Sequence, residues 1–323
     1  MFILPREKPI QMSIIEALTR RLPKNHPLHP SLQKEYNQRK KGLVGEENVD
    51  YYLSYLPESQ FHIFRGIRLI VDHKPFQIDT LLISRNLILL IEVKNRKGSL
   101  YFDDVYNQLI WSDEEKREVL EDPLQQVKRQ SRQLIKWLQE KRQPNIPIEY
   151  LVVMGDSGTF IDPKSGPLYQ KYILHAYSLE EKIDEIMQHY KKPLISNDAL
   201  HRLSTKLLKH HNPLIIDPQK TYKYDPKDLI KGIQCEKCKR FGMGRTNRKW
   251  TCPFCGATSF DAHKAAIQDY FLLIKREISN KECRDFLKIS SIKTAYTILN
   301  SMKLSYKGKY KNRIYFNQLR TGK

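Results

Sequence analysis

Long apolar segments are missing from this chain of 323 residues. No run approaches the ~18 apolar residues that a membrane-spanning helix needs, so we expect no membrane association. Residues 1–8 hold an apolar stretch too short for a secretory signal. The chain also lacks internal repeats and low-complexity tracts, and 40% of its residues are hydrophobic. We therefore expect a cytoplasmic, globular protein of two or three domains.

Cysteine is scarce, with five residues in the whole chain. Four of them form two Cys-x-x-Cys pairs with thirteen residues between the pairs: Cys235, Cys238, Cys252 and Cys255. This spacing is typical of a zinc site in a reducing compartment and not of a disulfide framework. Four thiolates leave no open position, so the expected Zn²⁺ is structural. The pattern resembles a zinc ribbon at residues 231–260, whereas Cys283 stands at helical spacing with Phe286 and Leu287 and is expected in a core.

Acidic residues are few in the C-terminal third. Residues 231–323 hold 21 Lys and Arg against 6 Asp and Glu, whereas residues 1–230 hold 35 against 30. Such an excess of positive charge indicates a polyanionic partner, and the phosphates of nucleic acid are the most plausible one. A solvated, lysine-rich surface is the alternative.

Helix and strand patterns alternate between residues 41 and 215, which predicts an α/β domain. A helix is expected at residues 41–56, strands at 61–71, 77–83 and 87–93, a hairpin around 100–111, a helix at 123–140, strands at 150–154 and 172–176, and helices at 178–190 and 197–210. Residues 1–40 are expected to be an arm with one helix near 10–21, and the Pro-, Lys- and Tyr-rich residues 216–230 a linker.

A carboxylate and an ammonium end the continuous apolar run at residues 87–93. Such a run predicts a strand buried on both faces, and Glu92 and Lys94 lie on the same face because strand side chains alternate. Asp79 stands beside the preceding apolar run, so pairing of the two strands brings it to Glu92. Two adjacent carboxylates favour Mg²⁺ or Mn²⁺ between them. The alternative is a buried ion pair between Asp79 and Lys94.

Asp79, twelve intervening residues and Glu92-Val93-Lys94 resemble the PD-(D/E)xK nuclease motif. The surrounding residues are similar to the nuclease-related domain (NERD) family within that superfamily over residues 41–140: Gly42-Leu43-Val44-Gly45-Glu46, Gln77-Ile78-Asp79, Glu92-Val93-Lys94-Asn95 with Gly98, Trp111 and Asp122-Pro123-Leu124-Gln125-Gln126. Two departures are Lys74-Pro75, which lies upstream of Asp79 instead of a proline immediately before it, and Asp122, where the family often has Asn.

The resemblance implies a restriction-endonuclease-like mixed sheet flanked by helices over residues 41–215. It further implies that Asp79 and Glu92 bind the metal and that Lys94 lies near the scissile phosphate. Glu46 and Gln126 would reach the same site from the first and the later helix.

The C-terminal residues 261–323 show three short helical patterns and then a basic hairpin, which resembles a winged helix-turn-helix. In that comparison Lys293, Thr294 and Thr297 face the nucleic-acid groove, and the hairpin contacts phosphate through Lys307, Lys309, Lys311 and Arg313. A small protein-interaction domain with a basic surface is the alternative.

These patterns together predict a metal-dependent nuclease that hydrolyses phosphodiester bonds through a metal-activated water, acting on DNA in preference to RNA. Two other readings use the same residues. In one, the nuclease fold is a scaffold without catalysis and the basic tail binds DNA; in the other, the chain is an adaptor that recruits proteins to DNA.

Overall fold

The computed structural model describes residues 1–317, and of Lys311 it describes only the backbone. The chain divides into two compact units. The first unit contains Met1–Lys8 and Gln38–Leu214, and the second contains Pro9–Asn37 and residues 215–317. Residues 1–40, expected to be an arm, are thus distributed between both units. Within residues 1–317, no helix is both long and apolar enough to cross a membrane.

The first unit is built on a mixed six-stranded sheet. Its strands, in spatial order, are β1 (Phe2–Leu4), β2 (His62–Val71), β3 (Lys74–Ile83), β4 (Ile88–Lys94), β8 (Ile148–Met154) and β10 (Ile173–His175). The pairs β2/β3 and β3/β4 are antiparallel, whereas β1/β2, β4/β8 and β8/β10 are parallel. The expected α/β architecture with a mixed sheet is therefore present.

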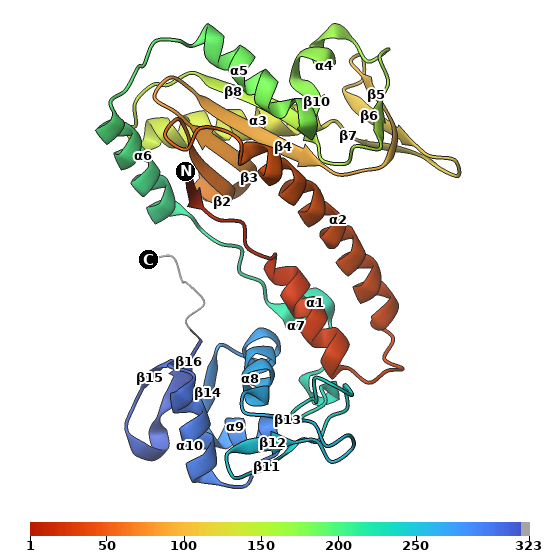
Figure 1. The fold of residues 1–323 in the computed structure, drawn as a ribbon, viewed down its shortest axis with the longest axis vertical. Helices are drawn as coiled ribbons and strands as arrows, with labels where there is room; N and C mark the ends of the chain where they lie inside the picture. Colours follow the sequence, from red (N-terminus) through yellow and green to blue (C-terminus); the bar gives the residue numbers. More distant parts are fainter. Residues whose placement is uncertain (318–323) are drawn as a thin grey trace. The chain divides into compact units, whose positions relative to one another are not determined.

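Helices cover both faces of this sheet (Figure 1). Leu90 of β4 belongs to a core shared with Leu124 of α3 (Pro123–Glu140) and with α6 (Asn197–His210). Ile91 of β4 belongs to a second core, shared with Val49 of α2 (His29–Leu53) and with α5 (Leu179–His189). This sandwiching explains why β4 is a continuous apolar run, because both of its faces are removed from water.

A smaller sheet follows directly after β4. It has the order β7 (Arg117–Glu121), β6 (Gln108–Ser112), β5 (Gly98–Asp103) and β9 (Thr159–Ile161), and α4 (Pro167–Tyr172) comes after β9 in the chain. The indole Nε1 of Trp111 donates to the carbonyl of Lys97 at 2.7 Å. Gly98 has φ +111°, and a Cβ there would lie 2.6 Å from the carbonyl oxygen of Ser112. The turn out of β4 therefore needs glycine at this position.

The second unit combines the first helix with the C-terminal modules. It contains α1 (Ile10–Arg21), α7 (Pro218–Tyr222), the strands β11 (Gly244–Thr246), β12 (Lys249–Thr251) and β13 (Thr258–Ser259), the helices α8 (Ala262–Leu273), α9 (Asn280–Leu287) and α10 (Ile292–Ser301), and the sheet β14 (Glu277–Ser279), β16 (Ile314–Phe316), β15 (Ser305–Lys307). Trp250 of the small β11–β13 sheet shares one core with Ile267 and Phe286 of the helices. The cysteine-containing segment and the helices therefore pack as one body.

A buried ion cluster joins α1 to α8 inside this unit. Asp269 accepts from Arg21 Nε at 2.9 Å and from Arg20 Nη2 at 2.6 Å. The Arg21 side chain is 1% exposed, and its Nη1 also donates to the carbonyls of Ile230 and Gly232 at 2.7 and 3.0 Å. Because Arg21 and Asp269 are both buried, removal of either one leaves an uncompensated buried charge.

Several elements differ from the expectations based on sequence. Helix α2 begins at His29 instead of residue 41, since Pro30 lies in its first turn, where its missing N–H has no helical partner to lose. Residues 216–230, expected to be a linker, contain α7 and the buried side chains of Tyr222, Tyr224 and Leu229. The strands β7, β9 and β14 were not anticipated, because each is at most five residues long and shows no clear alternation.

Candidate functional site

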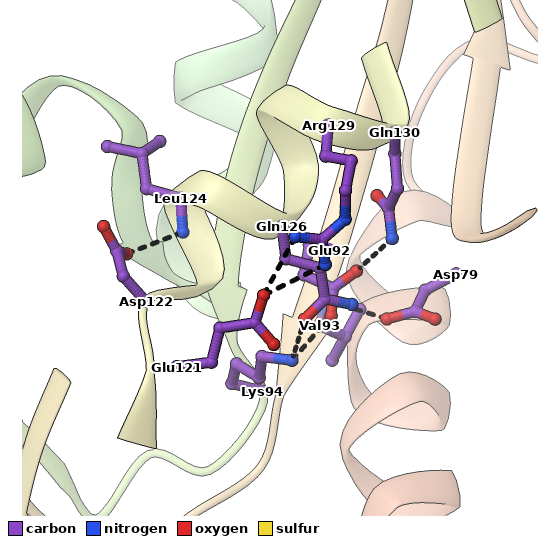
Figure 2. A network of polar contacts seen from close by, with 10 residues as sticks. All are labelled: Asp79, Glu92, Val93, Lys94, Glu121, Asp122, Leu124, Gln126, Arg129 and Gln130. Atoms are coloured by element: carbon purple, nitrogen blue, oxygen red, sulfur yellow. Dashed lines mark hydrogen bonds and ion pairs between the residues drawn. The ribbon is translucent and has the colours of Figure 1, made fainter. Parts of the chain in front are cut away.

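The charged residues at the end of β4 meet two glutamines of α3. Glu92 is 2% exposed. Its Oε1 accepts from Lys94 Nζ at 2.6 Å, and its Oε2 accepts from Gln130 Nε2 at 2.9 Å. Lys94 Nζ also donates to Gln126 Oε1 at 2.9 Å, so one turn of α3 fixes both side chains (Figure 2). Burial of this carboxylate is possible because both of its oxygens are hydrogen-bonded.

Asp79 lies where the pairing of β3 with β4 ends. The last backbone pair joins Thr80 to Ile91, and the next free amide, Val93 N–H, donates instead to Asp79 Oδ2 at 3.0 Å (Figure 2). Burial, followed by the negative charges of Glu92 and Glu46, raises the pKa of Asp79 well above its ordinary value. This carboxylate is therefore under electrostatic strain that a nearby cation would relieve.

Helix α2 brings Glu46 to the same place through a close backbone approach. A Cβ on Gly155, just after β8, would lie 2.6 Å from the Cα of Gly45. The side chain of Asn48 donates to the carbonyl of Gly155 at 2.9 Å, and that of Asn95 donates to the carbonyl of Lys41 at 2.6 Å. These contacts lock α2 beside the ends of β4 and β8.

Glu46 shares the electrostatic environment of Asp79. Burial raises the pKa of Glu46, the cation of Arg6 opposes this rise, and the charges of Asp50 and Glu92 reinforce it. The net pKa lies above the ordinary value. Glu46, Asp79 and Glu92 therefore interact with one another, although they come from three different elements.

Arg6, which follows β1, was not anticipated from the sequence. Its Nε donates to Asp50 Oδ2 at 2.6 Å, its Nη2 donates to Asp50 Oδ1 at 3.1 Å and to Thr80 Oγ1 at 3.2 Å, and its Nη1 donates to Glu46. Only 8% of the Arg6 side chain is exposed. Burial lowers the pKa of Arg6, but the bonds and charges of Asp50 and Glu46 outweigh this and raise it overall.

The start of α3 is fixed by Asp122. Asp122 is fully buried and caps α3 by accepting from the Leu124 N–H at 2.8 Å (Figure 2). Its second oxygen accepts from Tyr169 Oη at 3.0 Å. Asp122 therefore orients the helix that carries Gln126 and Gln130, and it lies outside the carboxylate group itself.

The donor set of this carboxylate group suits a hard divalent cation. Carboxylate oxygens are the ligands that Mg²⁺ and Mn²⁺ prefer. Burial, reinforced by the neighbouring negative charges, raises the pKa values of Asp79 and Glu46. The three carboxylates are held by Arg6, by the Val93 N–H, and by Lys94 with Gln130. They are not among the groups of residues 1–317 whose ligand atoms lie within 4.8 Å of one another.

The four expected cysteines do form such a group. Their sulfur atoms lie within 4.8 Å of one another, with Cys235 to Cys255 at 3.7 Å and Cys238 to Cys252 at 3.6 Å. Burial opposes ionisation of Cys252, but the backbone N–H groups of Phe254 and Cys255 outweigh it and lower the pKa of this thiol to about 7. Four thiols in this arrangement can bind one Zn²⁺. Cys283, by contrast, is fully buried, and burial raises the pKa of its thiol to about 12.

The residues of the C-terminal module that the sequence predicts to bind nucleic acid lie on α10 and on β15 and the β15–β16 connection. Lys293 and Thr297 are exposed on α10 and Thr294 is half-buried; Thr297 Oγ1 donates to the carbonyl of Lys293 at 3.0 Å. Lys307 and Lys309 are exposed on and after β15, and the side chain of Lys311 lies outside the described residues.

Arg313 connects α10 with the hairpin. Its guanidinium carbon lies 4.2 Å from the ring centroid of Tyr306 and 5.6 Å from that of Tyr296. Both tyrosines are about half exposed, at 55% and 47%. Exposed aromatic rings, which the pattern of basic residues does not predict, therefore lie beside Arg313.

Comparisons with known proteins agree with the resemblance of the first unit. The model of the nuclease-related domain (NERD) matches residues 41–155. No curated protein matches the chain. Among solved structures, the crystal structure of protein VC1899 from Vibrio cholerae matches with 10% identity and a TM-score of 0.27, covering 50% of this chain and 36% of that one. The chain therefore spans about a third of that protein's length, and this similarity is too low to carry an argument.

Proposed function

We propose that the protein is a metal-dependent nuclease that hydrolyses phosphodiester bonds in nucleic acid, with DNA the preferred substrate. The observation that carries the proposal is the buried Glu92, which is hydrogen-bonded to Lys94 and lies near Asp79. Burial and the other carboxylates raise the pKa of Asp79. The match of residues 41–155 to the nuclease-related domain supports it. A divalent cation held there would supply an activated water and stabilise the charge on the phosphoryl group.

In this proposal Asp79 and Glu92 hold the cation, and Glu46 completes the set from α2. The Lys94 ammonium offers a third N–H beyond its bonds to Glu92 and Gln126, which can orient a water or a phosphate oxygen. Gln126 acts as a positioning residue, because it holds the ammonium at the end of β4. Gln130 does the same for the carboxylate of Glu92.

The proposal assigns nucleic-acid binding to the second unit. The order α8, β14, α9, α10, β15, β16 with a three-stranded sheet supports a winged helix, and the clustered cysteines support a structural zinc ribbon beside it. Lys293, Lys307 and Arg313 would contact phosphates. Tyr296 and Tyr306 add stacking surfaces for bases, and the free cysteines suit a reducing compartment such as the cytoplasm.

A second candidate is a nucleic-acid-binding scaffold or adaptor without catalysis. It is favoured by one observation: both oxygens of Glu92 and one of Asp79 already have partners within the chain. The same experiment separates the two functions. The purified full chain is incubated with labelled single- and double-stranded DNA and RNA in Mg²⁺, Mn²⁺ or EDTA. Cleavage that requires the cation is the result expected of the nuclease, and uniformly intact substrates would favour the scaffold.

Substitution Tyr306→Ala should weaken binding to single-stranded DNA by about 1–3 kcal/mol, the usual contribution of one stacked base. It removes a ring that is 55% exposed and also holds Arg313 in place. The measurement is fluorescence anisotropy with a labelled oligonucleotide at fixed salt, in EDTA to prevent cleavage.

Tyr106→Ala provides the matched control, because Tyr106 is 76% exposed in the turn between β5 and β6 of the other unit. This variant should bind like the native chain. Equal affinity of the Tyr306→Ala and native proteins would move the proposed binding surface away from α10 and the hairpin.

A further inference from the structure

Arg6 lies among acidic side chains, and the proposed function gives it no role. Its guanidinium makes two hydrogen bonds to Asp50, one to Thr80 and one to Glu46. Both Arg6 and its acidic partners are shielded, with the Asp50 side chain 11% exposed and that of Glu46 29% exposed. A buried cation in such a place acts strongly on any other charge nearby, because water screens it little.

The negative charge of Asp50 is not compensated by Arg6 alone. Arg65 Nε lies 3.0 Å from Asp50 Oδ1, so two arginines share this carboxylate. For Glu46, by contrast, Arg6 is the cationic partner that the described residues 1–317 provide. The Arg6–Asp50–Arg65 group is therefore an anchor, and the contact with Glu46 is the part of it that reaches the candidate metal site.

Two of the three carboxylates of the candidate metal site are bonded to cationic side chains of the protein itself. Glu92 is bonded to Lys94 and Glu46 is bonded to Arg6. Within residues 1–317, the ligand atoms of the four cysteines lie within 4.8 Å of one another, and those of these three carboxylates do not. A cation shared by Glu46, Asp79 and Glu92 would compete with the Arg6 guanidinium for Glu46, because two positive charges that face one shielded carboxylate repel each other.

We propose that Arg6 is an internal counter-cation that competes with the divalent cation for Glu46 and so lowers the affinity of the site for metal. This inference rests on the proposed function. In the metal-free protein the guanidinium stabilises the acidic cluster; when the metal binds, Glu46 shifts towards it and away from Arg6. The N-terminal segment thereby sets the cation concentration at which the site fills.

The test measures Mg²⁺ binding to the full chain by calorimetry, without substrate. Mg²⁺ is chosen because a hard cation avoids thiolates, so the cysteines do not contribute. Arg6→Gln should bind Mg²⁺ about tenfold more tightly than the native chain, since a buried unit charge a few ångströms from Glu46 is removed. Its melting temperature in EDTA should fall, and Mg²⁺ should raise it by more than it raises that of the native protein.

Arg65→Gln is the matched control. It removes the same charge from the same anchor, but Arg65 contacts Asp50 and packs over the Phe2 ring at 3.5 Å. We expect its Mg²⁺ affinity to stay within about threefold of native, because its guanidinium binds Asp50, which is not one of the proposed metal ligands. An equal gain in both variants would show a general loss of charge and would overturn a specific role of Arg6. Unchanged or weaker Mg²⁺ binding in Arg6→Gln would overturn it as well.

A measurement on the native chain covers the case in which Arg6→Gln fails to fold. The guanidinium ¹⁵N resonances of Arg6 are followed by NMR during a Mg²⁺ titration, and they should shift with the same midpoint as the calorimetric binding. Resonances that stay unchanged at saturation would refute the competition while leaving the nuclease proposal intact. Absence of Mg²⁺ binding from both native and variant chains would instead refute the metal site, and with it the proposed function.

Discussion

Asp79→Asn should abolish metal-dependent cleavage, lowering the rate by about a thousandfold or more, because loss of a metal ligand removes several kcal/mol of transition-state stabilisation. Folding should be preserved. The amide oxygen of Asn can still accept from the Val93 N–H, which the native Asp79 Oδ2 accepts at 3.0 Å. Burial, followed by the charges of Glu92 and Glu46, raises the pKa of Asp79; a neutral Asn avoids both effects, so the metal-free protein should be at least as stable.

The measurement is the cleavage rate at saturating Mg²⁺, together with the melting temperature in EDTA. Asp72→Asn is the control: Asp72 lies in the β2–β3 turn with φ +47°, a conformation that Asn adopts readily, and its side chain is 58% exposed. It should cleave like native protein. Native cleavage that persists in Asp79→Asn would place the active site elsewhere.

Glu92→Gln should give the same loss of cleavage, although this substitution disturbs the hydrogen bonds around residue 92. The new amide nitrogen would face either Lys94 or Gln130, both of which donate to Glu92. Gln130 can accept a hydrogen bond from the new amide, since its Oε1 is buried without a partner among the described residues. Rotation of the Gln130 amide lets this oxygen accept from the variant side chain, so we expect the fold to survive.

Cys252→Ser should release zinc and unfold the second unit. Four thiolates at this spacing contribute an apparent binding free energy of about 10–16 kcal/mol, which is also folding free energy in small metal-bound domains. The loss should extend beyond the ribbon, because Cys252, Trp250 and Phe286 belong to one core. Elemental analysis should find about one zinc per native chain and less in the variant, and circular dichroism should show the helical loss.

Cys283→Ser is the control for this variant. Cys283 is also fully buried but lies outside the group of four sulfur atoms. Its replacement should lower stability, because a hydroxyl is buried, and leave the zinc content unchanged. A native protein without zinc, purified in the absence of chelators, would refute the ribbon.

The parts of the site that follow from local sequence were predictable. Alternation along β4 places Glu92 and Lys94 on one face, as their direct hydrogen bond requires. The helix at residues 123–140 was predicted at its observed ends, because Pro123 and the apolar periodicity define it. The cysteine spacing likewise predicted the group that the structure forms.

Other parts depend on contacts between residues distant in the chain. Arg6 meets residues 40 and more positions away, and no local pattern marks an arginine after three apolar residues as part of an acidic cluster. Gln130 is a different case: it lies one turn after Gln126 on the same face of α3, so helical spacing alone offered a signal for it. Tyr222 and Tyr224 were read as linker residues because their burial requires partners that local composition does not reveal.

The buried position of Arg21 has a practical consequence for dividing the protein. A fragment that starts near residue 215 would keep Asp269 and the carbonyls of Ile230 and Gly232 but lose the guanidinium that neutralises and binds them. It would also expose the aromatic rings over which this group lies, Phe241 and Phe286. The C-terminal fragment should therefore aggregate on its own and regain solubility with a synthetic peptide of residues 9–37, so the second unit has to be transplanted as two segments.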